Sequence, residues 1–244
     1  MLQHIDEPER LRTYRDIVRA AARNDQRPLS DLERRRMTML ESQLHHRGTL
    51  RAAEQTATYL ATTPAIVDEL EELREVLEDR VTLPSQILPV LAWPLALHRH
   101  YSRREIAVGV GYVSAGDKSL NLQTGILKLK DTKQELLFVT LDKSSKDFSP
   151  TTRYRDYAIS TDRFHWETQA GASVTRPSGK RYVDPSSDWR FYLFVRTDPG
   201  AAFCFLGPVR YATHEGDRPI AVTWQLETPM PASLFERYAT LRPT

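Results

Sequence analysis

The apolar positions of residues 1–82 recur at the spacing of α-helices. One helix is predicted over residues 10–23, where neither Gly nor Pro interrupts the pattern. A second helix follows Ser30, which forms a capping-box pattern with Glu33, and the same pattern of Ser102 with Glu105 predicts a short helix later in the chain. A later helix begins at Pro64, a residue type that suits a first helical turn. An apolar stripe along that helix predicts that one of its faces packs on another element, and its members are Ile66, Leu70, Leu73 and Leu77.

Beyond about residue 120 the apolar positions take on the period of β-strands. Residues 125–130 (GILKLK) alternate, and residues 135–141 (ELLFVTL) form an apolar run typical of a central strand. Two further runs flank the turn sequence TDPG, which predicts a hairpin. We therefore expect an α+β protein. Residues 1–82 form a helical bundle, and residues 83–244 form a mostly antiparallel, curved or partly closed sheet with short flanking helices, because no helix-length crossovers separate the strands.

Charge and cysteine content narrow the class of protein. Residues 1–82 contain 13 Arg, no Lys and 16 acidic residues, whereas residues 83–244 contain 21 basic and 16 acidic residues. The second part therefore permits a polyanionic partner. The single cysteine, Cys204, lies in an apolar run, so no disulfide frame is expected and the chain is predicted to be cytoplasmic. No apolar run approaches the roughly 20 residues that span a bilayer, so no membrane partner is expected.

Catalytic motifs are missing from the sequence. It contains no GxxxxGK[ST] loop, no HExxH, no CxxC and no GxSxG. We therefore expect no cofactor, no metal site and no enzymatic activity by the chain alone. His98 and His100 could form a metal-binding pair, but an exposed polar linker is the favoured interpretation.

Residues 137–166 concentrate charged and aromatic side chains directly after a predicted strand. One interpretation is a nucleic-acid surface, with cations on phosphates, flat rings under bases and carboxylates at base edges. An equally weighted alternative is that the rings are core and the charges pair with one another. The candidates for phosphate contact are Lys143, Lys146, Arg153 and Arg155. The candidates for a base pocket are Asp142, Tyr154, Asp156, Tyr157 and Trp166.

Two rival interpretations assign the chain other functions. Asp142, Asp147 and Lys143 could form a metal-dependent nuclease site, although this spacing is common in loops. Alternatively, the apolar helical stripe that begins at Ile66 could make the chain a protein-interaction scaffold for a separate motor.

Four segments resemble a bacterial domain of unknown function found at the C-terminus of superfamily 2 DNA helicases. They are YSRREI (101–106), FVTLDKSSKDFSPTTRYRDYAIS (138–160), FHW (164–166) and FLGPVRYATHEGDRPIAVTWQLETPMP (205–231). In addition, HIDEPERLRTYR (4–15) and LSDLERRRMTML (29–40) resemble the helical connector that precedes this domain. Some members of the family act as type IV restriction enzymes and carry a phospholipase-D-type nuclease.

This resemblance implies a target-recognition module that binds double-stranded DNA and reads a modified cytosine by base flipping. It also implies a fold of the SRA or PUA kind, and helicase and nuclease modules as partners in cis or in trans. Those modules are missing from these residues, so we expect the chain either to be part of a longer gene product or to work with separate proteins. Residues 177–189 are expected to form a loop, either a mobile connection or a second DNA contact through Lys180 and Arg181. The sequence around His214 and Glu215 predicts a hairpin turn, with a pocket rim as the alternative.

Overall fold

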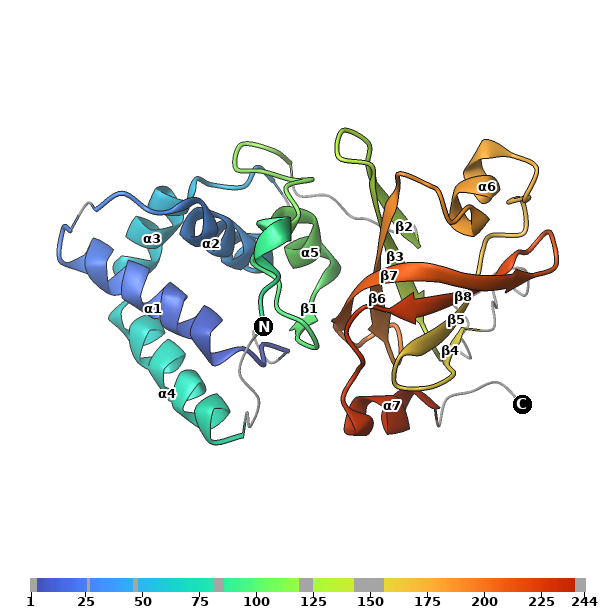
Figure 1. Cartoon of the computed structure of the whole chain (residues 1–244). Helices are drawn as coiled ribbons and strands as arrows, with labels where there is room; N and C mark the ends of the chain where they lie inside the picture. Colours follow the sequence, from blue (N-terminus) through green and yellow to red (C-terminus); the bar gives the residue numbers. More distant parts are fainter. Residues whose placement is uncertain are drawn as a thin grey trace. The chain divides into compact units, whose positions relative to one another are not determined.

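The chain folds into two compact units, Met1–Gln123 and Thr124–Thr244 (Figure 1). The structure is a computed structural model. Sequence patterns placed the boundary at residue 82, but the first unit includes the segment that follows. Leu50 donates its backbone N–H to the Asp117 carbonyl at 3.0 Å, which ties that segment to the helices. The structure describes residues 4–25, 27–45, 48–80, 86–118, 125–142 and 156–239.

The first unit is built from helices whose starts were visible in the sequence. Ser30 and Ser102 each accept a hydrogen bond from the backbone N–H three residues on, which confirms both predicted capping boxes. The apolar faces pack into one core, in which Leu11, Tyr14 and Met37 are fully buried. The elements in chain order are α1 (Pro8–Ala22), α2 (Asp31–Leu44), α3 (Ala53–Ala61), α4 (Pro64–Arg80), η1 (Pro89–Leu91), β1 (His100–Tyr101) and α5 (Arg103–Gly109).

The second unit is a mostly antiparallel open sheet with two helices, so the prediction of an α+β fold is confirmed. Its strands follow the spatial order β2-β3-β6-β7-β8-β5-β4, and β3 pairs with β6 in parallel while the other neighbours on this path are antiparallel. The elements are β2 (Ile126–Leu129), β3 (Gln134–Thr140), β4 (Tyr157–Ala158), β5 (Arg163–Glu167), α6 (Pro177–Val183), β6 (Arg190–Arg196), β7 (Phe203–Glu215), β8 (Ala221–Leu226) and α7 (Ala232–Ala239).

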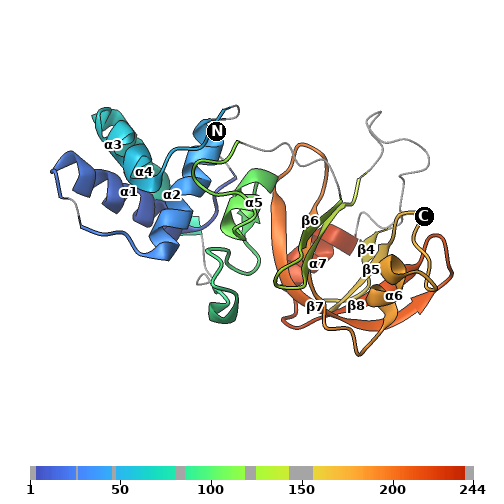
Figure 2. The same ribbon diagram turned by 90° about the horizontal axis from the view of Figure 1, so that it is seen from above.

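The sheet curves around α7, as the predicted curvature requires (Figure 2). Helix α7 packs against β4 at one edge of the sheet, and its Tyr238 hydroxyl donates to the Val195 carbonyl of β6 at 3.4 Å. Strands β4 and β6 are separated by β5, β8 and β7 in the sheet order, so one helix reaches both only if the sheet bends. The alternate residues of β8, Val222, Trp224 and Leu226, all point into the resulting core.

Residues 177–183 form helix α6 and not the loop that their Pro, Ser and Gly content predicted. Pro177 occupies the first turn, where its missing N–H is not needed. Gly179 is buried, and a Cβ there would lie 2.1 Å from the Ser173 carbonyl oxygen. The glycine that suggested a loop therefore allows the helix to pack tightly on the preceding turn.

No helix in the described ranges is long and apolar enough to cross a membrane.

Candidate nucleic-acid interface

Five of the sequence candidates fall within residues 143–155, outside the described part of the chain. They are Lys143, Lys146, Arg153, Tyr154 and Arg155. The remaining six candidates, on β3, β4, β5 and α6 or beside them, have defined positions: Asp142, Asp156, Tyr157, Trp166, Lys180 and Arg181.

Trp166 lies in the core of the second unit and not at its surface. Its side chain is 5% exposed and belongs to an aromatic cluster with Tyr182, Phe191 and Trp224. The ring of Tyr182 meets that of Trp166 edge-on at 5.1 Å, and Phe191 lies 4.9 Å from Trp224. Trp166 is thus almost completely enclosed by the protein, which favours a packing role over base stacking.

Asp142, Asp156 and Tyr157 have separate local roles. Asp142 is half-buried just after β3, and its backbone N–H donates to the Thr197 carbonyl at 2.7 Å. Asp156 is 4% exposed, and its Oδ1 accepts the backbone N–H of Glu167 at 2.9 Å, which ties the start of β4 to the end of β5. Tyr157 is half-buried and stacks on the neighbouring ring of His165, with 4.6 Å between centroids and 8° between planes.

Arg181 projects from α6 onto a buried carboxylate of the sheet. Its Nε donates to Glu135 Oε2 at 2.8 Å, and Glu135 is fully buried. The Tyr182 hydroxyl donates to the other oxygen of the same carboxylate. The guanidinium also lies 5.2 Å from the centre of the half-buried Trp189 ring, within cation–π range. These contacts fix the direction of the Arg181 side chain.

The electrostatics of this group follow from its burial. Burial by itself lowers the pKa of Arg181, but the adjacent Tyr182 and Glu135 outweigh it and the pKa is raised. Burial is the main cause that raises the pKa of Tyr182, and the Glu135 carboxylate adds to it. Arg181 therefore stays charged and Tyr182 stays protonated near neutral pH.

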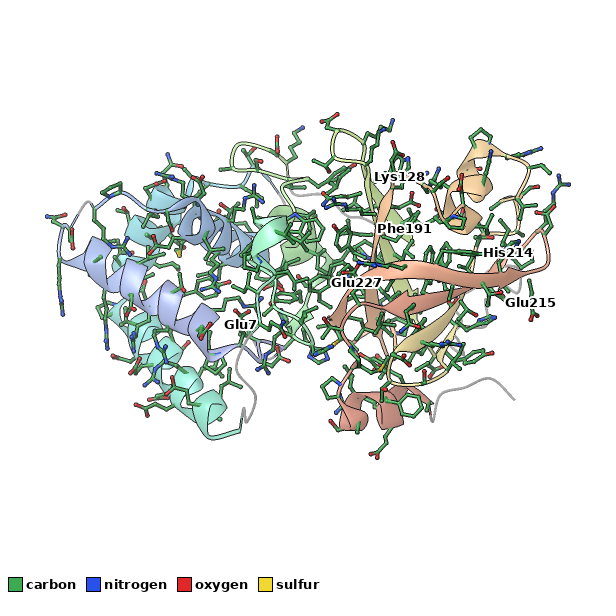
Figure 3. All side chains as sticks on the ribbon, viewed as in Figure 1. Glu7, Lys128, Phe191, His214, Glu215 and Glu227 are labelled. Carbon is green, nitrogen blue, oxygen red and sulfur yellow. The ribbon has the colours of Figure 1, made fainter. Side chains whose placement is uncertain are left out.

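Six cations lie on β2, the β2–β3 turn, the start of β6 and α6, a group that we call the basic rim: Lys128, Lys130, Lys133, Lys180, Arg181 and Arg190. Lys128 pairs across the β2–β3 ladder with Glu135, the partner of Arg181. The Arg190 backbone N–H donates to the Lys133 carbonyl at 2.9 Å, so the start of β6 adjoins the β2–β3 turn. Figure 3 marks Lys128 on β2 and Phe191 on β6, the two neighbours of Glu135 in the sheet.

The predicted turn at the end of β7 is confirmed. Gly216 has φ +69°, a left-handed backbone that glycine adopts without strain. His214 is half-buried there, and its Nδ1 is 2.8 Å from the Tyr211 hydroxyl, while Glu215 is exposed (Figure 3). In the described residues, no three His, Cys, Asp or Glu side chains come together in a way that could hold a metal ion. His100 instead contacts Asp6, with Nδ1 2.7 Å from Oδ2.

Sequence reasoning missed Glu135, Tyr182 and Trp189, which surround Arg181, and also His165, which stacks on Tyr157. Glu135 carried a signal, since it is the one charged residue in the apolar run ELLFVTL and lies at the start of a central strand. A charge at such a position requires a buried partner, but the sequence gives no indication of which cation supplies it.

Three comparisons with known proteins place the chain. No curated protein matches it. A crystal structure of Arabidopsis thaliana SUVH6 in complex with SAM is similar with a TM-score of 0.38 and 10% sequence identity, over 94% of this chain and 41% of that one. The present chain thus spans less than half of that protein. Residues 95–238, more than half of the sequence, match the domain of unknown function DUF3427, so the chain belongs to the DUF3427 family.

Proposed function

We propose that the chain binds double-stranded DNA through the basic rim and that its second unit recognises a modified cytosine taken out of the base stack. The observation that carries the proposal is the rim itself, where four cations lie at one end of the sheet and two more lie on α6. The sequence resemblance to helicase-associated target-recognition domains supports the finer part, the modified base.

The rim has more positive charge than its carboxylates neutralise. Four carboxylates lie among its six cations, which leaves a net charge of +2. Asp188 pairs with Lys133 and the buried Glu135 pairs with Arg181, while Asp184 interacts electrostatically with Lys180 and Asp131 lies in the β2–β3 turn. Lys128, Lys130 and Lys180 are exposed on β2, the β2–β3 turn and α6. Exposed lysines at one edge suit phosphate oxygens, because each contact releases counterions from DNA. Because Arg181 pairs with Glu135, its side chain is held in one orientation and it adds little net charge to the surface.

Base recognition would use a ring beside these cations or a pair of rings on the other edge strands of the sheet. Trp189 is half-buried next to Arg181, so part of its ring remains available to a base. The Tyr157–His165 pair offers a second flat, half-buried surface on β4 and β5. Tyr154, which the sequence also nominates, remains a candidate outside the described residues. The buried Trp166 supports the pocket from within the core.

Fluorescence anisotropy on the full chain tests the proposal. The probes are matched duplexes that contain cytosine, 5-methylcytosine or 5-hydroxymethylcytosine. Substituting Lys128, Lys130 and Lys180 together with Ala is expected to weaken binding to every duplex and to reduce the slope of log K against log salt by about 2.7. The matched control removes three exposed arginines of the first unit, Arg23, Arg27 and Arg34, and is expected to leave the slope unchanged.

The outcomes separate the two parts of the proposal. Tighter binding to one modified duplex supports the base reader, and equal binding to all three leaves a DNA-binding protein without base selectivity. No salt-sensitive binding by the wild-type chain, or equal effects of the rim and control variants, would refute DNA binding through the rim.

We also propose that the chain does not cut DNA by itself and acts with helicase and nuclease modules in cis or in trans. Of the rival nuclease set, Lys143 and Asp147 lie outside the described residues, and Asp142 is half-buried beside Thr197. Incubation of modified plasmid DNA with the chain and Mg²⁺ or Mn²⁺ is expected to leave it intact. Cleavage abolished by Asp142→Ala would establish the nuclease instead.

A further inference from the structure

An apolar groove of about 560 Å³ opens on the first unit between α2, α3 and α4. Its floor consists of Leu40, Leu60 and Leu70, each only 2–3% exposed. Val76 on α4 stands at its edge with 45% of its surface exposed. This volume is in the range of roughly 300–1,000 Å³ that is typical of ligand pockets. The groove is thus an open extension of the helical core.

Helix α4 is held by α1 on the face that points away from the groove, which leaves the groove-lining face of α4 open. Arg15 of α1 contacts Glu71 at 2.5 Å, and Arg12 of α1 contacts Glu78 at 2.5 Å. Arg74 pairs with the same two glutamates. These ion pairs fix the polar face of α4 against α1, while Ile66, Leu70 and Leu73 line the groove. Figure 2 shows α2, α3 and α4 together in the first unit.

The charged residues in the described lining of the groove are both acidic. Glu69 and Glu72 line it and are both exposed, and no Lys, Arg or His belongs to its described lining. An occupant must therefore place apolar side chains on the floor of the groove and positive charge beside Glu69 and Glu72. An amphipathic helix does both, with apolar anchors at i, i+3 or i+4 and i+7 and cations beside them.

We propose that this groove docks a basic amphipathic helix of a separate protein. The leucines of the floor receive the apolar anchors, and Glu69 and Glu72 pair with Lys or Arg that flank them. Burial of apolar surface holds the helix in place. The two glutamates of the groove favour a basic helix over an acidic helix of equal hydrophobicity. The proposal is independent of DNA binding, because the groove and the basic rim belong to different units.

Synthetic peptides test the proposal with the full chain. The probe is a fluorescein-labelled peptide of about 18 residues, or roughly five helical turns, with leucines at i, i+3, i+4 and i+7 and lysines beside them. One comparison peptide carries glutamates in place of the lysines, and another has the same composition in scrambled order. The lysine peptide is expected to bind at least about tenfold more tightly than either.

Variants of the chain assign the binding to the groove. Val76→Glu at the edge is expected to weaken binding of the lysine peptide, whereas Val90→Glu, at a residue that is 79% exposed and outside the groove, is expected to leave it unchanged. Glu69→Lys with Glu72→Lys is expected to reverse the preference toward the glutamate peptide. Circular dichroism checks that each variant keeps its helices.

Several results would overturn the proposal. They are no saturable binding of the lysine peptide, equal binding of the scrambled peptide, or equal effects of Val76→Glu and Val90→Glu. A dimer in sedimentation experiments that Val76→Glu dissociates would assign the groove to a second copy of this chain instead.

Discussion

Glu105 is predicted to be among the most sensitive positions of the first unit, because it neutralises a buried arginine. Glu105 and Arg10 are both fully buried, with Arg10 Nη1 3.4 Å from Glu105 Oε1. A second buried pair, Arg36 with Glu7 at 3.1 Å, lies in the same core. The four charges sum to zero. Glu105→Gln keeps the shape of the side chain but leaves one net positive charge in the interior.

The expected cost of Glu105→Gln is about 3–5 kcal/mol of the free energy of unfolding, the usual result of removing one partner of a buried pair. Most of that cost comes from the charge that remains, so Arg10→Met combined with Glu105→Gln is expected to restore a large part of it. The matched control is Arg34→Ala, whose exposed ion pair with Glu54 is expected to be worth at most ~1 kcal/mol.

Urea denaturation followed by circular dichroism at 222 nm measures these changes, because α1 to α5 supply most of the helical signal. Tryptophan fluorescence reports mainly on the second unit, where Trp166, Trp189 and Trp224 lie, and is expected to shift little. A Glu105→Gln cost no larger than that of Arg34→Ala, or a double variant less stable than Glu105→Gln alone, would refute the reasoning.

The stability that Glu105 contributes is expected to fall as the pH is lowered. Burial raises the pKa of Glu105, but Arg10 and His4 lower it more, and the net pKa is below the ordinary value of 4.5. A depressed carboxylate contributes its stability above the unfolded pKa and loses it as the pH falls through the folded pKa. The stability difference between wild type and Glu105→Gln is therefore expected to be full near neutral pH and to shrink in acid below about pH 4.5.

Two other substitutions test local features of the two units. The pKa of Glu33 is lowered to about 2, and the hydrogen bond with Arg27 is the largest cause. The stability lost in Glu33→Gln is therefore expected to be constant above pH 4.5 and to vanish as the pH falls toward 2. Urea titrations at several pH values measure this loss. Gly179→Ala would place a Cβ 2.1 Å from the Ser173 carbonyl oxygen, and is expected to lower the melting temperature through a loss of about 1–3 kcal/mol, whereas Gly171→Ala, with no atom within 4 Å, is the control expected to change it little.

Local signals in the sequence were sufficient for most helices and strands. The capping boxes at Ser30 and Ser102 both form, and the long apolar runs become β3, β6 and β7. The short strands β4 and β5 were missed, because two to five residues are too few for a period to show. The α6 helix was missed because its glycine serves a close tertiary contact that only the folded chain reveals.

Ion pairs between residues far apart in the sequence could not be predicted from local patterns. Glu105 was correctly read as the second half of a capping box, and its Oε2 does accept the Ser102 backbone N–H at 2.8 Å. The same carboxylate also neutralises Arg10 and lies 2.6 Å from His4 Nε2, contacts that no local pattern encodes. These contacts explain why the first unit continues past the boundary that composition suggested.

In the candidate site, too, the sequence predicted some of the residues but not their partners or their burial. Lys180 and Arg181 were nominated from composition, and both lie on the basic rim. The partner of Arg181 is Glu135, 46 residues away in the sequence, so neither the ion pair nor the direction of the arginine could be predicted. Trp166 was nominated for stacking because aromatic rings near cations suit bases, but the sequence pattern alone does not distinguish a ring on the surface from one in the core.

The position of Trp166 determines how its mutation must be interpreted. Trp166 packs on Tyr182, Tyr182 donates to Glu135, and Glu135 holds Arg181 on the rim. Trp166→Ala would therefore disturb α6, and it would weaken the proposed DNA binding even if no base ever touches the ring. A stacking residue lowers affinity without lowering stability, whereas a core residue lowers both. DNA titrations of Trp166 variants are informative about base recognition only when the free energy of unfolding is measured on the same protein.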